Sequence, residues 1–379
     1  MTIAVISMIR DAWGGSEELW AAMADEALDK GHRVIHVAYR FTPVHPKMQA
    51  LVNKGLVVYY RPSYKPVRGN VLQKSIGKAV FFVQKRLQTA LHKMFKERPD
   101  VILYNGTCYS IADEKTLLAR LAKLHTRFYI LGHFNREDGN DLADAHTPII
   151  KNAYERSKKV FFITERSIQK ARLFLKANIP NALVVRNPVN ISSTGIIPYA
   201  AGETIQFAMV GNLVTVHKGQ DIALQVLAAE RWKERAWHLN IYGSGQDELA
   251  LKNLVELLGL KNNVSFNGRV TDIRAVWCSN HMLLMPSRME GMPLAVVEAM
   301  ICGRPSVVTD VGGHTEWVEN GKHGFVAELA NALSFGEALE RAWLARGNWG
   351  AIGQQAHKKA MEFFDPHAGQ TLLTLLEEA

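Results

Sequence analysis

The chain has 379 residues, and 45 Lys and Arg against 36 Asp and Glu give a net charge of +9. Hydrophobic residues make up 47% and charged residues 21%, which argues against a disordered chain and predicts a packed core in two domains or three small ones. Cys108, Cys278 and Cys302 are far apart and odd in number, which argues against a disulfide framework or a zinc cluster and favours a reducing compartment. No run of 18 or more apolar residues occurs, so any membrane association is expected to be peripheral.

Short β-branched runs alternate with segments of helical period, which predicts βαβ units and parallel sheets covered on both faces. In the first half the expected strands are 3–8, 34–38, 56–60, 101–104, 128–131 and 160–163. A helix is expected over 17–30, where Gly31 ends it.

A domain junction is expected within residues 187–202, which hold two prolines and show no period. The second series of expected strands is 205–210, 238–242, 264–266, 281–285 and 305–308. We therefore expect a first domain over 1–187, a second over 188–362, and a C-terminal helix within 363–379 that completes the first. Two consecutive open parallel sheets predict an α/β protein with a cleft between its domains.

Residues 286–300 (PSRMEGMPLAVVEAM) are the most informative stretch. A helix is expected over 292–302, with Pro293 in its first turn, and Glu298 is the only residue on it that is not apolar. A helix that is apolar all round is buried, so Glu298 should be a buried carboxylate that needs hydrogen-bond donors, such as ribose hydroxyls. Glu290 lies just before the same helix, whose first amides favour anions.

Glu290 and Glu298, with seven residues between them, resemble the E-x7-E motif of the family 4 retaining glycosyltransferases, which have the GT-B fold. Further resemblances follow in order along residues 3–327: Gly14-Gly15-Ser16-Glu17 with Gly31-His32, and residues 157–164, 186–190, 241–245, 263–270 and 310–316. The resemblance implies two Rossmann-like, doubly wound domains that face each other across a cleft.

The resemblance also implies roles for single residues. Glu290 would contact hydroxyls of the donor sugar, Lys218 would neutralise the leaving diphosphate, and His133 would reach the sugar near the bond that breaks. Glu298 would bind the ribose, and Val270 would offer its backbone to the base. The other implied substrate-binding positions are Gly14, Gly15, Asn212, Gly243, Gly245, Gly291, Met292, Pro293 and Leu294.

Each of these positions also has a plainer explanation. The glycines can serve only to shape turns, Lys218 can be a solvated lysine, and His133 can be a hydrogen-bonded structural histidine. Glu298 can be a core ion-pair partner and Glu290 a residue that starts a helix. The order in which the motifs occur favours the functional interpretation.

The sequence departs from the family pattern at Asn212. Many relatives have an arginine there, with the lysine five positions later, whereas Lys218 lies six positions after Asn212. An arginine can clamp a phosphate with two parallel hydrogen bonds and asparagine cannot, so charge neutralisation is expected to rest on Lys218 and helix amides.

The expected reaction needs no metal and no cofactor. Asp138, Asp141 and Asp144 are the nearest approach to a metal cluster, but their spacing is more typical of a solvated helix face or loop. The resemblance implies retention at the anomeric carbon, with the leaving phosphate helping to deprotonate the acceptor.

Residues 41–96 contain eleven Lys or Arg and no Asp or Glu. Within them, 71–95 intersperses apolar residues with cations, a pattern typical of a helix that lies on an anionic membrane or recognises an anionic acceptor. The alternative is that its apolar face packs on the first domain.

The leading prediction is a cytoplasmic enzyme, with peripheral contact at the inner face of the cytoplasmic membrane as a further expectation. It would transfer a hexose-type sugar from a UDP- or GDP-linked donor to a glycan or lipid-linked acceptor of polysaccharide or lipopolysaccharide type. A sugar-nucleotide epimerase, a phosphorylase and a non-catalytic sugar-binding relative stay open as alternatives. Nucleic-acid binding is suggested by charge alone, without a recognition motif, and is not expected.

Overall fold

The computed structural model describes residues 1–9, 13–62, 83, 89–199 and 202–378. The chain forms two compact units, the first comprising Met1–Pro188 and Pro366–Ala379 and the second Val189–Asp365. The chain therefore leaves the first unit once and returns to it with its last residues.

A parallel sheet of seven strands lies at the centre of the first unit, in the order β3-β2-β1-β4-β5-β6-β7. The strands are β1 (Thr2–Ser7), β2 (Arg33–Ala38), β3 (Val57–Tyr60), β4 (Val101–Gly106), β5 (Arg127–Gly132), β6 (Lys159–Phe162) and β7 (Ala182–Val184). β1, β4 and β5 are almost wholly buried apolar runs, as expected for strands covered on both faces. The strand order reverses between β1 and β4.

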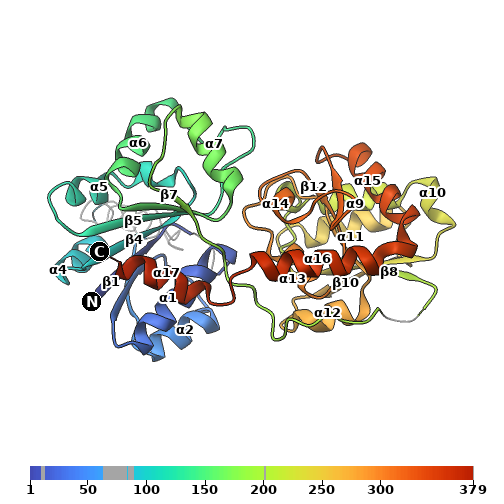
Figure 1. Ribbon diagram of the computed structural model, residues 1–379, viewed down its shortest axis with the longest axis horizontal. Helices are drawn as coiled ribbons and strands as arrows, with labels where there is room; N and C mark the ends of the chain where they lie inside the picture. Colours follow the sequence, from blue (N-terminus) through green and yellow to red (C-terminus); the bar gives the residue numbers. More distant parts are fainter. Residues whose placement is uncertain (10–12, 63–82, 84–88, 200–201, 379) are drawn as a thin grey trace, which may run out of the picture. The chain divides into compact units, whose positions relative to one another are not determined.

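The helices of the first unit cover both faces of this sheet (Figure 1). They are α1 (Gly15–Asp29), α2 (Pro46–Asn53), α4 (Thr89–Lys96), α5 (Lys115–Leu121), α6 (Thr147–Arg156), α7 (Glu165–Leu175) and α17 (Ala368–Glu377), with 3-10 helices at Ser110–Asp113 and Asp144–His146. The C-terminal helix α17 lies along α1, and this close approach needs Gly369, because a Cβ there would lie 2.6 Å from the carbonyl carbon of Ala22. The carboxylate of Glu377 in α17 also pairs with Lys30 and His32, which follow α1.

The second unit contains a parallel sheet of six strands in the order β10-β9-β8-β11-β12-β13. The strands are β8 (Ile205–Val210), β9 (Trp237–Tyr242), β10 (Val264–Gly268), β11 (Met282–Met285), β12 (Ser306–Thr309) and β13 (Gly324–Ala327). The helices are α8 (Thr215–Lys218), α9 (Gln220–Leu227), α10 (Glu230–Lys233), α11 (Glu248–Leu257), α12 (Ile273–Ser279), α13 (Leu294–Ile301), α14 (His314–Trp317), α15 (Ala332–Leu344) and α16 (Trp349–Phe363), with a 3-10 helix at Arg346–Asn348.

The sequence patterns predict all the strands of both sheets except β7 and β13, with boundaries within two residues. Both missed strands are short and lie at sheet edges, and β13 begins with a glycine, so neither carries a strong periodic signal. The helix expected over 292–302 begins at Leu294, because Pro293 is its N-cap with a ψ of 82°, outside the helical region.

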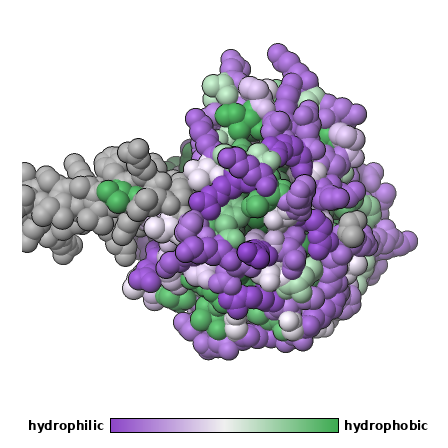
Figure 2. Space-filling model, turned by 90° about the vertical axis from the view of Figure 1, so that its left-hand side faces the viewer, coloured by the Kyte–Doolittle hydropathy of each residue, from purple (hydrophilic) through white to green (hydrophobic). Residues whose placement is uncertain are grey.

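Most of the predicted basic amphipathic helix of residues 71–95 lies outside the described residues. Its end belongs to α4, in which Ala90, Leu91 and Met94 are buried in the first unit while Lys93 and Lys96 are exposed. On the face of the molecule shown in Figure 2, hydrophilic side chains dominate and hydrophobic ones gather in small groups.

None of the helices among the described residues combines the length and the apolar composition that a membrane crossing requires.

Candidate functional site

The order of strands in the second sheet reverses between β8 and β11, which are hydrogen-bonded neighbours. The segment after β8 leads into the short helix α8, which ends at Lys218, and the loop after β11 carries Glu290. Ligands of open parallel sheets bind outside the carboxyl ends of the strands at such a reversal. Lys218 therefore lies after β8 and Glu290 after β11, the two strands between which a ligand is expected.

The two loops are joined through their backbones. The amides of Arg288 and Met289 donate to the carbonyl oxygen of His217 over 2.7 and 3.1 Å. Gly219 follows with a φ of +64°, and a Cβ there would lie 2.0 Å from the carbonyl oxygen of Pro286. Only glycine permits this approach, so the sequence Lys-Gly places α8 directly against the loop that carries Glu290.

A side-chain clasp reinforces the junction. Both terminal nitrogens of Arg288 donate to the carboxylate of Asp221 over 2.7 Å, and Nη1 also donates to the carbonyl oxygen of Thr215 over 2.7 Å. Such paired hydrogen bonds fix direction as well as distance. The sequence analysis did not predict this clasp. The one feature of the sequence that pointed to it was Arg288, a charged residue beside the Glu290 motif.

Lys218 and Glu290 form an ion pair, with Nζ 2.5 Å from Oε1, and Ser287 Oγ donates to the same oxygen over 2.8 Å. The Glu290 side chain is 6% exposed and that of Lys218 is 25% exposed. Burial by itself raises the pKa of a carboxyl group, but the Lys218 charge and these hydrogen bonds together hold the pKa of Glu290 below its usual value. The carboxylate is therefore ionised at neutral pH.

His314, which sequence analysis also missed, lies in the electrostatic field of this pair. It is fully buried at the start of α14, and its Nδ1 donates to the carbonyl oxygen of Thr309 over 2.7 Å. Burial lowers the pKa of His314, against the opposing effect of the Glu290 charge. The ring is therefore neutral, with an unprotonated Nε2 that has no hydrogen-bond partner in the described part of the chain.

The predicted burial of Glu298 is confirmed, because the residue is 7% exposed on a helix whose residues 295–301 are all buried. Gly291, in the loop before α13, accepts a hydrogen bond from the amide of Gly313 over 2.9 Å. Gly312, with a φ of +52°, packs on the backbone of Glu290, where a Cβ would lie 2.1 Å from the carbonyl oxygen. Residues 311–314 thus support the segment that holds Met292, Pro293 and Leu294.

Gly243 and Gly245 follow β9 and pack against the segment after β8. A Cβ at Gly243 would lie 1.8 Å from the carbonyl oxygen of Gly211, and one at Gly245 would lie 2.3 Å from that of Leu213. The amide of Leu213 donates to the carbonyl oxygen of Ser244 over 3.1 Å. Contact between two loop backbones therefore requires glycine at both positions.

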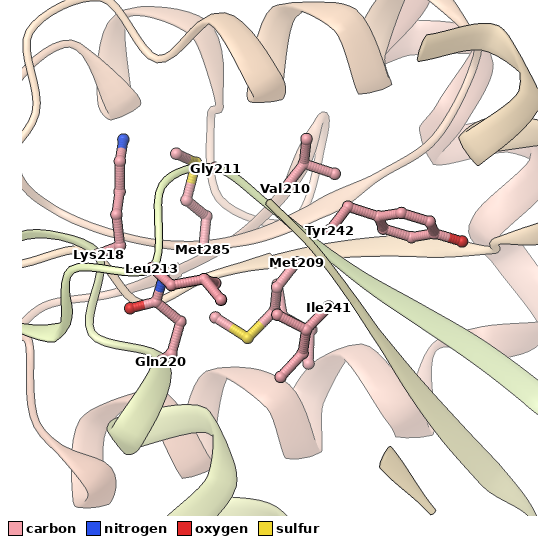
Figure 3. Close-up of a pocket in the computed structure, with 10 residues that line it drawn as sticks. Met209, Val210, Gly211, Leu213, Lys218, Gln220, Ile241, Tyr242 and Met285 are labelled. Atoms are coloured by element: carbon pink, nitrogen blue, oxygen red, sulfur yellow. The ribbon is translucent and has the colours of Figure 1, made fainter. Parts of the chain in front are cut away.

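Figure 3 shows the pocket beneath these loops. The ends of β8, β9 and β11 line it together with Gly211, Leu213, Lys218 and Gln220. The Lys218 side chain extends beside Gly211, with its ammonium group directed away from the apolar side chains of the pocket. Asn212 is exposed, and Val270 is half-buried just after β10.

In the first unit, Gly14 is the N-cap residue of α1, and Gly15 is the first residue of that helix. Gly14 has a φ of −159°, which is extended backbone open to any residue, and among the described residues the nearest atom to a Cβ there would be Ser16 Oγ, 4.0 Å away. Neither backbone strain nor a close contact with the described residues therefore requires glycine at position 14, unlike positions 243 and 245.

His133 comes directly after β5 and is buried. Its Nε2 lies 2.6 Å from Oδ1 of Asn105, the last but one residue of β4. Burial lowers the pKa of His133 to about 3, so the ring is neutral at pH 7.

Among the described residues, no group of three or more His, Cys, Asp or Glu is arranged to hold a metal ion. Asp138 instead pairs with Arg136, and Asp141 accepts from the Arg136 amide.

Residues 204–344 match the family model described as Glycosyl transferases group 1. This segment includes every predicted site residue of the second unit. An uncharacterised glycosyltransferase of Haemophilus influenzae is 34% identical over 161 residues, which make up 42% of this chain and 45% of that protein. The chain spans less than half the length of the first curated relatives that it matches.

Similarity to solved structures extends over the entire chain. Anabaena HepE in complex with UDP matches with a TM-score of 0.74 and 18% identity, covering 100% of both chains. The apo form of WaaB, a lipopolysaccharide outer core galactosyltransferase, matches with a TM-score of 0.71 and 17% identity, again over 100% of both chains. The chain has the GT-B fold. The two parallel-sheet units are the two Rossmann-like domains of GT-B, and the matched family segment lies within the second.

Proposed function

We propose that this GT-B protein is a retaining glycosyltransferase. It moves a hexose-type sugar from a UDP- or GDP-linked donor to a glycan or lipid-linked acceptor, in the biosynthesis of a cell-surface polysaccharide or glycolipid. The family match, the fold and the names of the relatives support this proposal. The observation that carries it is the Lys218–Glu290 ion pair beside the strand reversal of the second sheet.

The ion pair suits a donor with one anionic end and one end rich in hydroxyls. When the donor binds, the Lys218 ammonium group moves to the diphosphate oxygens, and sugar hydroxyls donate to Glu290 in its place. Ser287 already donates to Glu290, and the clasp between the loops keeps both residues in position. The carboxylate thus exchanges one set of donors for another without becoming a buried unpaired charge.

Further residues bind the rest of the donor. Glu298 accepts hydrogen bonds from the ribose hydroxyls, and Val270 offers its backbone to the base. The backbone from Gly291 to Leu294, together with Asn212, Gly243 and Gly245, borders the diphosphate and the sugar. In the first unit Gly14 and Gly15 leave room for substrate, a role that is supported by the absence of a described atom closer than 4.0 Å to a Cβ at Gly14.

The reaction breaks the bond between the anomeric carbon and a phosphate oxygen and forms a bond from that carbon to the acceptor oxygen. The acceptor approaches from the side of the leaving group, so the configuration is retained, and its proton passes to the leaving phosphate. Lys218 stabilises the negative charge that grows on the diphosphate, and His133 binds a hydroxyl of the sugar. No protein nucleophile and no metal ion enters this scheme.

The acceptor is assigned to the first unit, and residues 41–96 are proposed to contact an anionic membrane surface. Their excess of cations favours anionic lipid or an anionic glycan, and a location at the inner face of the cytoplasmic membrane would bring both within reach. Nucleic acid is not a proposed partner.

Two measurements test the proposal. Thermal shifts with a panel of UDP- and GDP-sugars should identify one donor that raises the melting temperature. With that donor, acceptor-dependent release of nucleoside diphosphate should be lost on Glu290→Gln. Glu340→Gln is the matched control, because Glu340 is also ion-paired in the second unit, with Arg235, outside the site. Transfer unchanged by Glu290→Gln, or a product of inverted anomeric configuration, would contradict the proposal.

A further inference from the structure

A buried polar network lies beside the strand reversal of the first sheet. β1 and β4 are neighbours there, and Ser7, the last residue of β1, stands opposite Asn105 of β4. Glu17 lies at the start of α1, the helix that follows β1. β5 pairs with β4, and His133 comes directly after β5. All four side chains are buried. Polar side chains from three neighbouring strand ends thus meet at the sheet edge where ligands bind in this kind of fold.

The orientation of the Asn105 amide follows from its partners. Its Nδ2 lies 3.3 Å from the carbonyl oxygen of Ser16 and 3.1 Å from Glu17 Oε1. A backbone carbonyl can only accept, so this end of Asn105 is the NH2 group, and its oxygen faces His133.

The orientation of Asn105 determines the tautomer of His133. The Asn105 oxygen, 2.6 Å from Nε2, is an acceptor, so Nε2 carries the hydrogen. A neutral ring has only one such hydrogen, which leaves Nδ1 with a free lone pair. That Nδ1 is buried and has no hydrogen-bond partner among the residues that the structure describes. A buried acceptor without a donor is unusual and calls for an explanation.

Glu17 in turn holds Asn105. Its Oε2 accepts from Trp20 Nε1 over 2.9 Å, and its Oε1 accepts from Ser7 Oγ over 2.9 Å as well as from Asn105. The indole N–H can only donate, so the Glu17 oxygens meet donors on both sides. The hydrogen bonds therefore converge on Glu17: Trp20 donates to it from one side, Asn105 donates to it from the other, and His133 donates to Asn105.

We propose that Glu17 and Asn105 are positioning residues that hold His133 as the Nε2–H tautomer, so that Nδ1 accepts a hydrogen bond from a hydroxyl of the sugar substrate. The inference rests on the proposed function, because the sugar supplies the hydroxyl. It assigns His133 the role of acceptor and not of proton donor or cation. It also explains why a glutamate is buried at the start of α1, where a purely apolar contact would suffice for packing.

The tautomer can be measured without any enzymatic turnover. Long-range 1H–15N spectra of protein labelled with 15N-histidine distinguish a protonated from an unprotonated ring nitrogen, and His133→Gln identifies the His133 signals. At pH 8, the wild-type protein should show a protonated Nε2 and an unprotonated Nδ1. A protonated Nδ1 in the wild-type protein would overturn the proposal, whether or not any variant folds.

Variants test the two positioning residues separately. Asn105→Ala should remove the acceptor and give a mixture of both His133 tautomers. Glu17→Gln places an NH2 group against either Trp20 or Asn105 and leaves the Ser16 carbonyl oxygen as the remaining acceptor that orients the Asn105 amide, so a smaller shift towards the same mixture should follow. Asn181→Ala is the matched control, because it deletes an amide of the first unit whose partners among the described residues are Tyr154 and Ser157. An unchanged His133 spectrum in Asn105→Ala or Glu17→Gln would remove that residue from the proposal.

Kinetics then connect the tautomer to the substrate. Asn105→Ala should lower kcat/KM on the order of 100-fold, as expected when a contact group is misplaced, while Asn181→Ala should not. A donor analogue lacking the hydroxyl that His133 binds should react equally well with the wild-type protein and with Asn105→Ala. If every deoxy analogue keeps the full difference, the hydroxyl contact is wrong. Absence of transfer by the wild-type protein would instead refute the proposed function and leave the spectra to decide on the network.

Discussion

Lys218 Nζ lies 2.5 Å from Glu290 Oε1, so the two charged side chains expected at the sugar and diphosphate neutralise each other in this structure. The pair is unequal, because the carboxylate is almost wholly buried and the ammonium group is a quarter exposed. The lysine can leave towards solvent or a ligand at modest cost, whereas the glutamate depends on whatever donors replace it. This asymmetry gives the first prediction.

Lys218→Met should destabilise the protein by about 1–3 kcal/mol, because it leaves the Glu290 carboxylate buried without its cation. This loss is smaller than that expected for a fully buried ion pair, because Lys218 is partly exposed to solvent. Adding Glu290→Gln to this variant should recover most of the loss. Urea unfolding at pH 7 measures both. If the double variant is less stable than Lys218→Met, the buried charge is not the cause.

Loosening the clasp between the two loops should weaken donor binding. Arg288→Lys keeps the charge but cannot form the paired hydrogen bonds to Asp221, so Lys218 and Glu290 lose their fixed separation. We expect about a tenfold weaker affinity for the nucleoside diphosphate by calorimetry, corresponding to ~1.4 kcal/mol. Arg235→Lys is the control, because Arg235 forms the same paired contact with Glu340 outside the site. Equal losses in both variants would point to a general effect on stability.

Gly243→Ala should destabilise the second unit and reduce donor binding together. A Cβ would lie 1.8 Å from the carbonyl oxygen of Gly211, at a φ of +137°, so the segment that leads to Lys218 has to move. Gly350→Ala in α16 is the control, because no atom of the described residues lies within 4 Å of a Cβ there. Thermal melts with and without nucleotide separate the two effects. Unaltered binding in a folded Gly243→Ala protein would show that the backbone contact does not position the site.

The pH dependence of stability should reflect three buried groups of the first unit. Burial lowers the pKa of His36 and of His133 to about 3, with Arg61 adding to the effect at His36, and burial raises the pKa of Glu17 to about 7. Below pH 6.5 the unfolded state binds more protons at each histidine, so stability falls on acidification. Between pH 7 and 4.5 the native state binds more protons at Glu17, so that group gains stability on acidification.

The net expectation for these three groups is a loss of about 1.4 kcal/mol per pH unit between pH 6.5 and 4.5. Glu17→Gln should make the loss steeper by about the same amount, and His36→Phe, which preserves a ring beside Trp20, should cancel it. Urea unfolding free energies at several pH values measure these slopes. Identical slopes in the wild-type protein and both variants would show that the groups titrate normally.

The architecture was predictable because parallel strands buried on both faces leave apolar runs that alternate with helical periods. The burial of Glu298 was predictable for a related reason, since a lone carboxylate on a helix that is apolar all round has no exposed face to occupy. The short edge strands β7 and β13 lack such a pattern, and the sequence does not reveal them.

The contacts that shape the site depend on distances between segments far apart in the chain, which no local pattern records. Arg288 and Asp221 are 67 positions apart, and nothing in either stretch predicts that they meet. Gly14 and Gly243 look alike in the sequence, yet only Gly243 is required by a backbone contact. The tautomer of His133 depends on Asn105, 28 positions earlier, and this dependence becomes visible only when β4 and β5 are paired.

A crystal structure with a non-hydrolysable UDP- or GDP-sugar, chosen by the thermal-shift panel, would decide whether the ion pair of the second unit is the donor site. We expect Lys218 Nζ to leave Glu290 and contact diphosphate oxygens, and Glu290 to accept hydrogen bonds from the sugar hydroxyls. A bound donor with the Lys218–Glu290 contact still at 2.5 Å, or a donor bound away from both residues, would contradict the proposed mechanism.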